Sequence, residues 1–239
     1  MNVPRAPLTP YPAAPGLLAP AVVLAAALLA VLTVLAPPAA GAQERAVRGG
    51  DTLHGSSGVS CRVAFNAGRD GERYALMSGR CARDAGPLWY YGDAGTSVEI
   101  GRTDHVYFPG TDFAVIHYTN PDFTYPGELS TGTGQPIAIT RAAYPTIGAE
   151  VCHADGSTGV HCGRVTSMSV AISYPEGVVH DLFQSSACTE PGAAGGGPGH
   201  HGGTALGIIV SANGSCPAGG TTYYQPVASA LQTAGLSLY

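Results

Sequence analysis

Six cysteines are the residues of this sequence whose type and spacing most clearly imply chemistry. They stand at Cys61, Cys81, Cys152, Cys162, Cys188 and Cys216. Two reactions are open to such a set, oxidation to disulfides or ligation of a metal such as zinc. The sequence contains no Cys-x-x-Cys pair, the spacing typical of structural zinc sites. An even number without that spacing favours three disulfides in an exported chain, although the residues alone allow many pairings.

The eight histidines are the second group of candidate chemical residues. His200 and His201 are adjacent in a glycine-rich loop, and His153 and His161 stand next to two of the cysteines. No His-x-x-x-His pattern or cluster of carboxylates accompanies them. We therefore predict no metal site and no cofactor.

Composition restricts the class of protein and the kind of partner. Only 11% of the residues are charged, and 11 basic residues, all arginine, stand against 16 acidic ones. A net charge of −5 offers no basic stripe to a nucleic acid, so we expect no nucleic-acid partner. The apolar share of 45% argues against disorder, and 34 glycines favour turns and short strands over long helices.

Residues 1–42 have the features of an export signal. Arg5 precedes an apolar stretch from Leu17 to Leu35, and Ala40-Gly41-Ala42 has the small residues of a signal-peptidase site. Cleavage there would release a secreted chain that begins at Gln43 and has no membrane segment. The apolar stretch is close to the roughly 20 residues that a membrane span requires, so an uncleaved anchor is the alternative.

Residues 43–239 contain many short β-type runs separated by glycine, proline, asparagine or aspartate. This spacing predicts an all-β barrel or sandwich. One helix is expected at Val227–Ala234, with Gly235 as its C-terminal stop. Asn120–Gly134 contains no clear strand and is the candidate linker between two β units. Examples of these β-type runs are Ser60–Phe65, Arg73–Met77, Ser97–Ile100, Phe113–Tyr118, Gln135–Ile139, Gly163–Ala171, Val178–Phe183, Ala205–Ser211 and Thr221–Pro226.

Two long segments resemble parts of a known enzyme family. Val151–Gly163 resembles a disulfide-closed hairpin, and Gly219–Val227 resembles the C-terminal strand and helix entry, of bacterial chymotrypsin-like serine proteases of the streptogrisin and alpha-lytic type. The resemblance extends from Val47 to Tyr239. It implies a trypsin-like, all-β fold of two six-stranded antiparallel barrels, with a cleft between them and a short C-terminal helix.

The resemblance also implies an organisation and a disulfide pairing. The first barrel is expected at 43–122, a linker at 123–134, and the second barrel with the helix at 135–239. We expect a monomer. The implied disulfides are Cys61–Cys81, Cys152–Cys162 and Cys188–Cys216.

The catalytic base of this family is missing from the sequence. The family uses a serine nucleophile, a histidine base and an aspartate that orients the histidine. The histidine normally stands in Thr-Ala-Gly-His-Cys, where Met77–Cys81 of this chain is Met-Ser-Gly-Arg-Cys. Cys81 fixes the alignment, so Arg80 occupies the position of the base. A guanidinium stays protonated at neutral pH and cannot take a proton from serine. The aspartate is retained as Asp112.

The position of the nucleophile also lacks a hydroxyl. The family has Glu-Pro-Gly-Asp-Ser-Gly-Gly-Pro, where Glu190–Pro198 is Glu-Pro-Gly-Ala-Ala-Gly-Gly-Gly-Pro. Counting from the glutamate puts Ala194 at the serine, whereas counting back from the final proline puts Gly195 there. No serine lies between Ser186 and Ser211, so neither count restores a nucleophile.

Other positions of the expected cleft are altered as well. The backbone amides of Gly192 and Ala194 correspond to the oxyanion hole and could form a small anion-binding nest. Val210-Ser211-Ala212 stands where the family has Ser-Gly-Gly along the cleft. Val210 therefore removes a hydroxyl that in the family contacts the aspartate.

We expect the side chain of Arg80 to form an ion pair with Asp112. An aspartate buried alone would be costly, and the forked donors of a guanidinium suit a carboxylate. The alternative is that Arg80 points into solvent and Asp112 bonds only to the backbone.

These positions together predict a secreted pseudoprotease, a protein of the protease fold that is not an enzyme. Its expected partner is a peptide or protein ligand in the cleft between the barrels. One alternative is a hydrolase with a non-standard site, in which His200 or His201 acts with Asp112 or Glu190. The other is a relic with a filled cleft and no partner.

Overall fold

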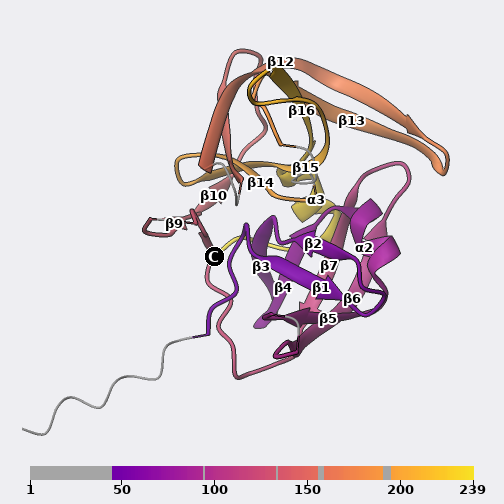
Figure 1. Ribbon diagram of the computed structural model, residues 1–239, viewed down its shortest axis with the longest axis vertical. Helices are drawn as coiled ribbons and strands as arrows, with labels where there is room; N and C mark the ends of the chain where they lie inside the picture. Colours follow the sequence, from indigo (N-terminus) through magenta and orange to yellow (C-terminus); the bar gives the residue numbers. More distant parts are fainter. Residues whose placement is uncertain (1–44, 94, 133, 156–158, 191–194) are drawn as a thin grey trace, which may run out of the picture. The chain divides into compact units, whose positions relative to one another are not determined.

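The computed structural model describes residues 45–93, 95–132, 134–155, 159–190 and 195–239. The predicted signal peptide lies outside these residues, and none of the helices they form is long and apolar enough to cross a membrane. Strands dominate the described chain and form two large sheets (Figure 1). The prediction of a mostly β, trypsin-like fold with a short C-terminal helix is confirmed.

The first sheet closes on itself as a barrel. Its strand order is β2-β1-β5-β6-β7-β4-β3, so β2 and β3 lie at opposite ends of the order. Only Val63 and Ala64 separate these two strands, and their N–H groups donate to Asp51 O and Leu76 O. β2 and β3 therefore belong to one continuous segment that joins the two ends of the sheet. Because this segment counts as one strand, the barrel has six strands. The bounds are β1 Thr52–Gly55, β2 Ser60–Arg62, β3 Phe65–Arg69, β4 Glu72–Met77, β5 Leu88–Tyr91, β6 Val98–Tyr107 and β7 Phe113–Tyr118.

The second sheet closes through β15, which pairs with both β14 and β16. The ring β11-β12-β13-β16-β15-β14 again has six strands, and β10 adds a parallel pairing to β15. The bounds are β10 Arg141–Ala142, β11 Glu150–Asp155, β12 Gly159–Tyr174, β13 Gly177–Ser185, β14 Pro198–His201, β15 Thr204–Ser215 and β16 Gly219–Pro226.

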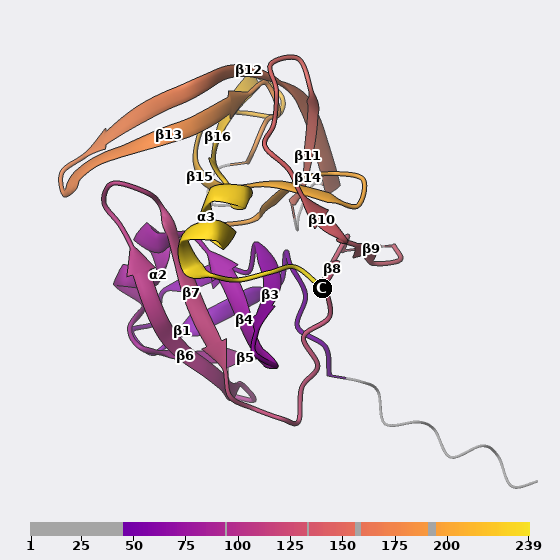
Figure 2. The same cartoon turned by 180° about the vertical axis from the view of Figure 1, so that it is seen from behind.

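The C-terminal helix α3 spans Val227–Ala234, as the sequence predicts. Gly235 ends it with a φ of 66°, a left-handed conformation that glycine adopts without strain. Seen from behind in Figure 2, the chain then runs from α3 to β3, where Ser237 forms an isolated antiparallel bridge with Gly68. The apolar side of α3 packs on residues of both sheets, including Phe113 and Ile208.

Three elements differ from the sequence prediction. A second helix, α2 at Gly79–Ala85, was not expected, because a helix of this length is too short to show a helical period. The candidate linker Asn120–Gly134 was expected to contain no strand, but it includes β8 at Glu128–Leu129, which pairs with β9 at Ile137–Ala138. The hairpin of β12 and β13 is longer than predicted, since β12 alone has 16 residues.

The disulfides join Cys61–Cys81, Cys152–Cys162 and Cys188–Cys216, the three pairs that the family resemblance implies. In the described part of the chain, two groups of side chains lie close enough to share a metal ion, and both contain disulfide cysteines. One group is Cys188, Cys216 and His161, and the other is Cys152, Cys162 and Glu150. Their sulfurs are not thiolates, so neither group offers the anionic sulfur that binds zinc.

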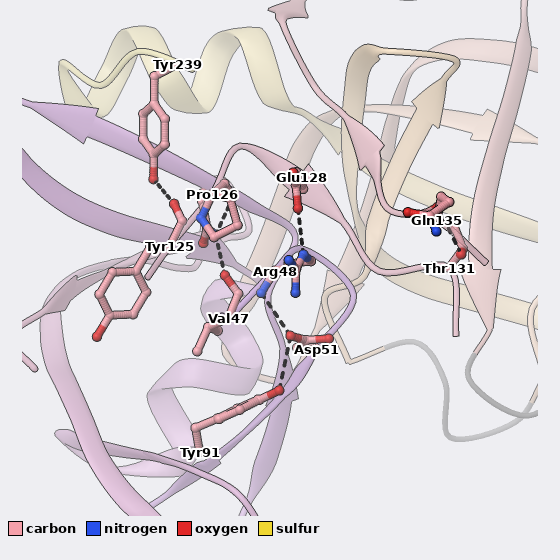
Figure 3. A network of polar contacts seen from close by, with 11 residues as sticks. Val47, Arg48, Asp51, Tyr91, Tyr125, Pro126, Glu128, Thr131, Gln135 and Tyr239 are labelled. Atoms are coloured by element: carbon pink, nitrogen blue, oxygen red, sulfur yellow. Dashed lines mark hydrogen bonds and ion pairs between the residues drawn. The ribbon is translucent and has the colours of Figure 1, made fainter. Parts of the chain in front are cut away.

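A polar network fixes the start of the described chain to the first barrel (Figure 3). Arg48 donates from its backbone to Asp51 at 2.9 Å and from its side chain to Glu128 at 2.6 Å. The hydroxyl of Tyr91 donates to the same carboxylate of Asp51. Burial raises the pKa of Asp51 despite these donors.

Candidate active site

The position of Arg80 is set by the short helix α2 and its cap. Ser78 is the N-cap, and its Oγ accepts a hydrogen bond from the N–H of Cys81 at 3.3 Å. Gly79 lies against β7 so closely that a Cβ there would be 2.6 Å from the carbonyl oxygen of Phe113. Only glycine fits this contact, which brings the first turn of α2 beside the start of β7.

Asp112, the residue before β7, is completely buried next to this turn. Its Oδ1 accepts hydrogen bonds from Ser78 Oγ and from the backbone N–H of Arg80, both at 2.9 Å. Its own N–H donates to Oε1 of Gln225, on β16 of the second barrel, at 3.0 Å. Its Oδ2 has no hydrogen-bond partner among the described residues, and burial raises the pKa of this carboxyl.

The predicted ion pair between Arg80 and Asp112 is not formed. No salt bridge among the described residues includes Arg80, and its contact with Asp112 is made by the backbone N–H. The guanidinium instead lies over the ring of Tyr174, with its central carbon 4.8 Å from the ring centroid. Arg80 is exposed, so its charge stays hydrated, and Oδ1 of Asp112 accepts from the hydroxyl of Ser78 instead of the guanidinium.

The alternative prediction for Asp112 is also wrong in one respect. Asp112 accepts from a side chain, Ser78, and not only from the backbone. Ser78 stands in the Met77–Cys81 motif, where the family has alanine at this position. The serine was therefore visible in the sequence, but its role depends on a contact 34 residues away that the motif does not show.

A cavity of about 260 Å³ brings most of the predicted cleft residues together. It contains Arg80 from α2, Val210 from β15, and Gly195, so both barrels contribute to it. Val59, Ser78, Cys81 and Asp84 complete its lining. Ser211 and Ala212 follow Val210 on β15, where the register of the pairing between β15 and β16 shifts. Neither Ser211 nor Ala212 lines the cavity.

The nucleophile loop is described only from Gly195 onward. Gly192 and Ala194, the predicted oxyanion-hole positions and the first candidate for the serine position, lie outside the described residues. The carbonyl of Gly195 accepts from the N–H of Arg62 at 2.8 Å, which fixes this glycine beside β2. At Gly196, φ is 101° and a Cβ would be 2.7 Å from the nitrogen of Ser78, so the loop meets the α2 cap through glycine.

The tip of the β12–β13 hairpin, which belongs to the second barrel, contacts α2 and the loop before β7. Its backbone pairs with Gly110, whose N–H donates to Val178 O at 3.0 Å and whose carbonyl accepts from His180 N–H at 2.9 Å. Glu176 at the tip forms an ion pair with Arg83 of α2 at 2.8 Å. These contacts hold Tyr174, in the same hairpin, against Arg80. Tyr174 stands in none of the family motifs quoted above, so the sequence did not predict it at the site.

The two adjacent histidines lie on β14. His200 is buried, its Nδ1 hydrogen-bonds with Gly202 O at 3.1 Å, and burial lowers its pKa. His201 is exposed and lies 3.3 Å from a carboxylate oxygen of Glu150. Within the described structure, the side-chain polar contacts of these two histidines are with Gly202 and Glu150, and not with Asp112.

Comparison with known proteins places the chain among bacterial proteases, although no family model matches it. It is 36% identical over 193 residues to Streptogrisin-D of Streptomyces griseus, across 80% of this chain and 48% of that protein. It therefore spans about half the length of that relative. It is 34% identical over 178 residues to Serine protease 2 of Streptomyces fradiae, across 74% of this chain and 100% of that protein.

Solved structures agree with these relatives. The alpha-lytic protease homolog N4 is 48% identical, covers 81% of this chain and 100% of its own, and superposes with a TM-score of 0.75. A glutamic-acid-specific serine protease that uses a histidine triad in substrate binding is 29% identical, with a TM-score of 0.74 over 81% of this chain and 100% of that chain. This chain therefore belongs to the chymotrypsin-like serine protease family, in the streptogrisin and alpha-lytic protease branch.

Proposed function

We propose that this protein is a binding protein built on a protease fold and has no peptidase activity. The observation that supports this most strongly is Arg80 at the position of the base, on the wall of the cleft cavity. A guanidinium has no lone pair with which to accept a proton from a nucleophile, so Arg80 cannot replace the histidine as a base.

The energetic argument concerns two absent groups. Removing the serine or the histidine alone costs on the order of 10⁶ in turnover in a well-studied serine protease. Oxyanion-hole and binding contacts leave a residual acceleration of roughly 10³–10⁴ over water. With Arg80 for the histidine and Ala194 or Gly195 for the serine, the chain retains only Asp112 of the triad.

Two alternatives are less well supported. A non-standard hydrolase would need a base near the cavity, but His200 is buried on β14 and His201 is next to Glu150. A relic with a filled cleft conflicts with the cavity of about 260 Å³ between the barrels. We therefore propose a peptide or protein ligand in the cleft, bound by a monomer.

Export is part of the same proposal. Three disulfides are consistent with an oxidising compartment outside the cytosol. We propose that the chain is secreted after cleavage behind Ala42.

The proposal is tested by restoring the missing groups in the natural chain. Arg80→His and Val210→Ser return the base and the strand hydroxyl. The nucleophile is restored in both possible registers, as Ala193→Asp with Ala194→Ser, or as Ala194→Asp with Gly195→Ser.

Each variant is assayed with casein and a fluorogenic peptide library. We expect no turnover by the natural chain and turnover by one restored register, which would show that the cleft still admits a peptide. Turnover by the natural chain would contradict the proposal. Ser78→Ala and His201→Ala variants would then identify the group responsible.

A further inference from the structure

Among the residues that the structure describes, the guanidinium of Arg80 has no anionic partner, in contrast to its cationic neighbour Arg83. On the same helix, Arg83 is paired with both Asp84 and Glu176, at 2.9 and 2.8 Å. Arg80 has no salt bridge with a described residue and is exposed at the cavity that it lines. It is therefore a positive charge available to a ligand in the cleft.

Tyr174 holds this charge in place. The guanidinium of Arg80 lies over the tyrosine ring at 4.8 Å, and the ring packs edge-on against Phe108 at 5.8 Å between centroids. The ion pair of Arg83 with Glu176 anchors the hairpin that bears Tyr174. A guanidinium stacked on a ring keeps its in-plane N–H donors for a second partner, and a carboxylate matches those donors in pairs.

The acidic groups near Arg80 do not already occupy it. Asp84, which also lines the cavity, is engaged by Arg83 at 2.9 Å. Glu176 is likewise bound to Arg83. Asp112 is completely buried, and its Oδ1 already accepts hydrogen bonds from Ser78 Oγ and from the backbone N–H of Arg80.

The rest of the cavity fits one end of a peptide. Val59 and Val210 give it apolar walls, and Gly195 leaves one side without a side chain. Its volume of about 260 Å³ suits a single residue more than a long ligand. A free α-carboxylate attached to an apolar residue would meet both the charge and the apolar walls.

We propose that the cleft recognises the carboxyl end of a peptide chain, with Arg80 as the ligand of the free α-carboxylate. This inference rests on the proposed binding function. The protease fold would then hold a chain that already ends in the cleft, and not an internal peptide bond. A neutral amide at the same place can still accept a hydrogen bond from the guanidinium, but it carries no opposite charge and therefore gains less from it.

The test compares N-acetyl-Ala-Ala-Pro-Leu and N-acetyl-Ala-Ala-Pro-Phe, each as the free acid and as the C-terminal amide. Their binding to the natural chain is measured by titration calorimetry at low and high salt. We expect each acid to bind about tenfold or more tightly than its amide, with the difference smaller at high salt. Arg80→Gln should remove the difference without weakening the amide.

Arg102→Gln is the matched control, an exposed arginine on β6 that does not line the cavity. It should leave the preference for the acid unchanged. Equal affinities for acid and amide, or no binding of either acid at millimolar concentration, would overturn the inference while leaving the absence of peptidase activity intact. Hydrolysis of a peptide by the natural chain would instead remove the proposed function on which the inference rests.

Discussion

Ser78 Oγ donates a hydrogen bond to Oδ1 of the buried Asp112 at 2.9 Å, across the gap between the cap of α2 and the start of β7. In the family motif the residue at this position is alanine, and the hydroxyl that contacts the aspartate comes from the strand position where Val210 stands. In this chain, the hydroxyl beside Asp112 therefore comes from Ser78 at the cap of α2, and not from strand β15. The replacement explains how Asp112 remains buried without a histidine or a paired arginine.

Ser78→Ala should destabilise the protein by about 1–3 kcal/mol at pH 7, because it removes a donor to a buried carboxylate and the cap of α2. Urea unfolding measures the change. Ser57→Ala is the control, since its hydroxyl donates to Asp84 O at an exposed site, and it should change stability by less than about 0.5 kcal/mol. Equal effects of the two substitutions would show that the bond to Asp112 has no special importance.

Asp112→Asn tests the raised pKa of the carboxyl. Burial raises this pKa above 3.8, so between that pH and the native pKa the folded state holds a proton that the unfolded chain has lost. The wild type therefore loses stability as the pH rises through that window, and the asparagine variant does not. Relative to the wild type, Asp112→Asn should become more stable from pH 4 to pH 7 in urea unfolding. The opposite trend would mean that Asp112 is stabilised as an anion.

Arg83→Gln tests the attachment of the β12–β13 hairpin. Its ion pair with Glu176 is about one-third exposed on both sides, so we expect little change in the melting temperature. The local effect should be larger, because the pair joins the hairpin tip to α2. Amide hydrogen exchange at Gly110 and His180, which bond across this contact, should become several-fold faster. Unchanged exchange there would show that the backbone pairing alone holds the hairpin.

His200→Phe tests the buried histidine of β14. Burial lowers the pKa of His200 below 6.5, so as the pH falls the unfolded chain binds a proton before the native state does. The wild type should lose stability between pH 6.5 and the lower native pKa, and the variant should lose less over the same range. Thermal unfolding from pH 7.5 to pH 4.5 measures both slopes. Parallel curves would contradict the assignment, and His201→Phe, at an exposed site, serves as the control.

The fold was predictable because short motifs of the sequence resemble a family whose fold fixes which distant strands and cysteines pair. The disulfide hairpin at Val151–Gly163 and the strand entering α3 resemble one family, and both occur in the structure where they were expected. The helix α2 was not predictable from periodicity, since its formation depends on the Ser78 cap and on the close contact of Gly79 with β7.

The site was predictable only in part. Motif alignment brought Arg80, Val210 and Gly195 to one place, and they line one cavity. The partner of Arg80 was not predictable, because charge alone suggested Asp112 while the long hairpin supplies Tyr174 from far along the chain. Gln225, which accepts from the N–H of Asp112 across the barrels, gave no local signal either.

The most direct test of the account is the cleavage of a complex peptide mixture by the purified natural chain with its disulfides intact. The mixture is incubated with the protein, with its Ser78→Ala variant and with buffer, and new peptide ends are identified by mass spectrometry. We predict the same set of ends in all three samples, because Arg80 cannot act as a base. New ends that appear with the natural chain at amounts proportional to its concentration would contradict the claim that this protein binds peptides without cleaving them.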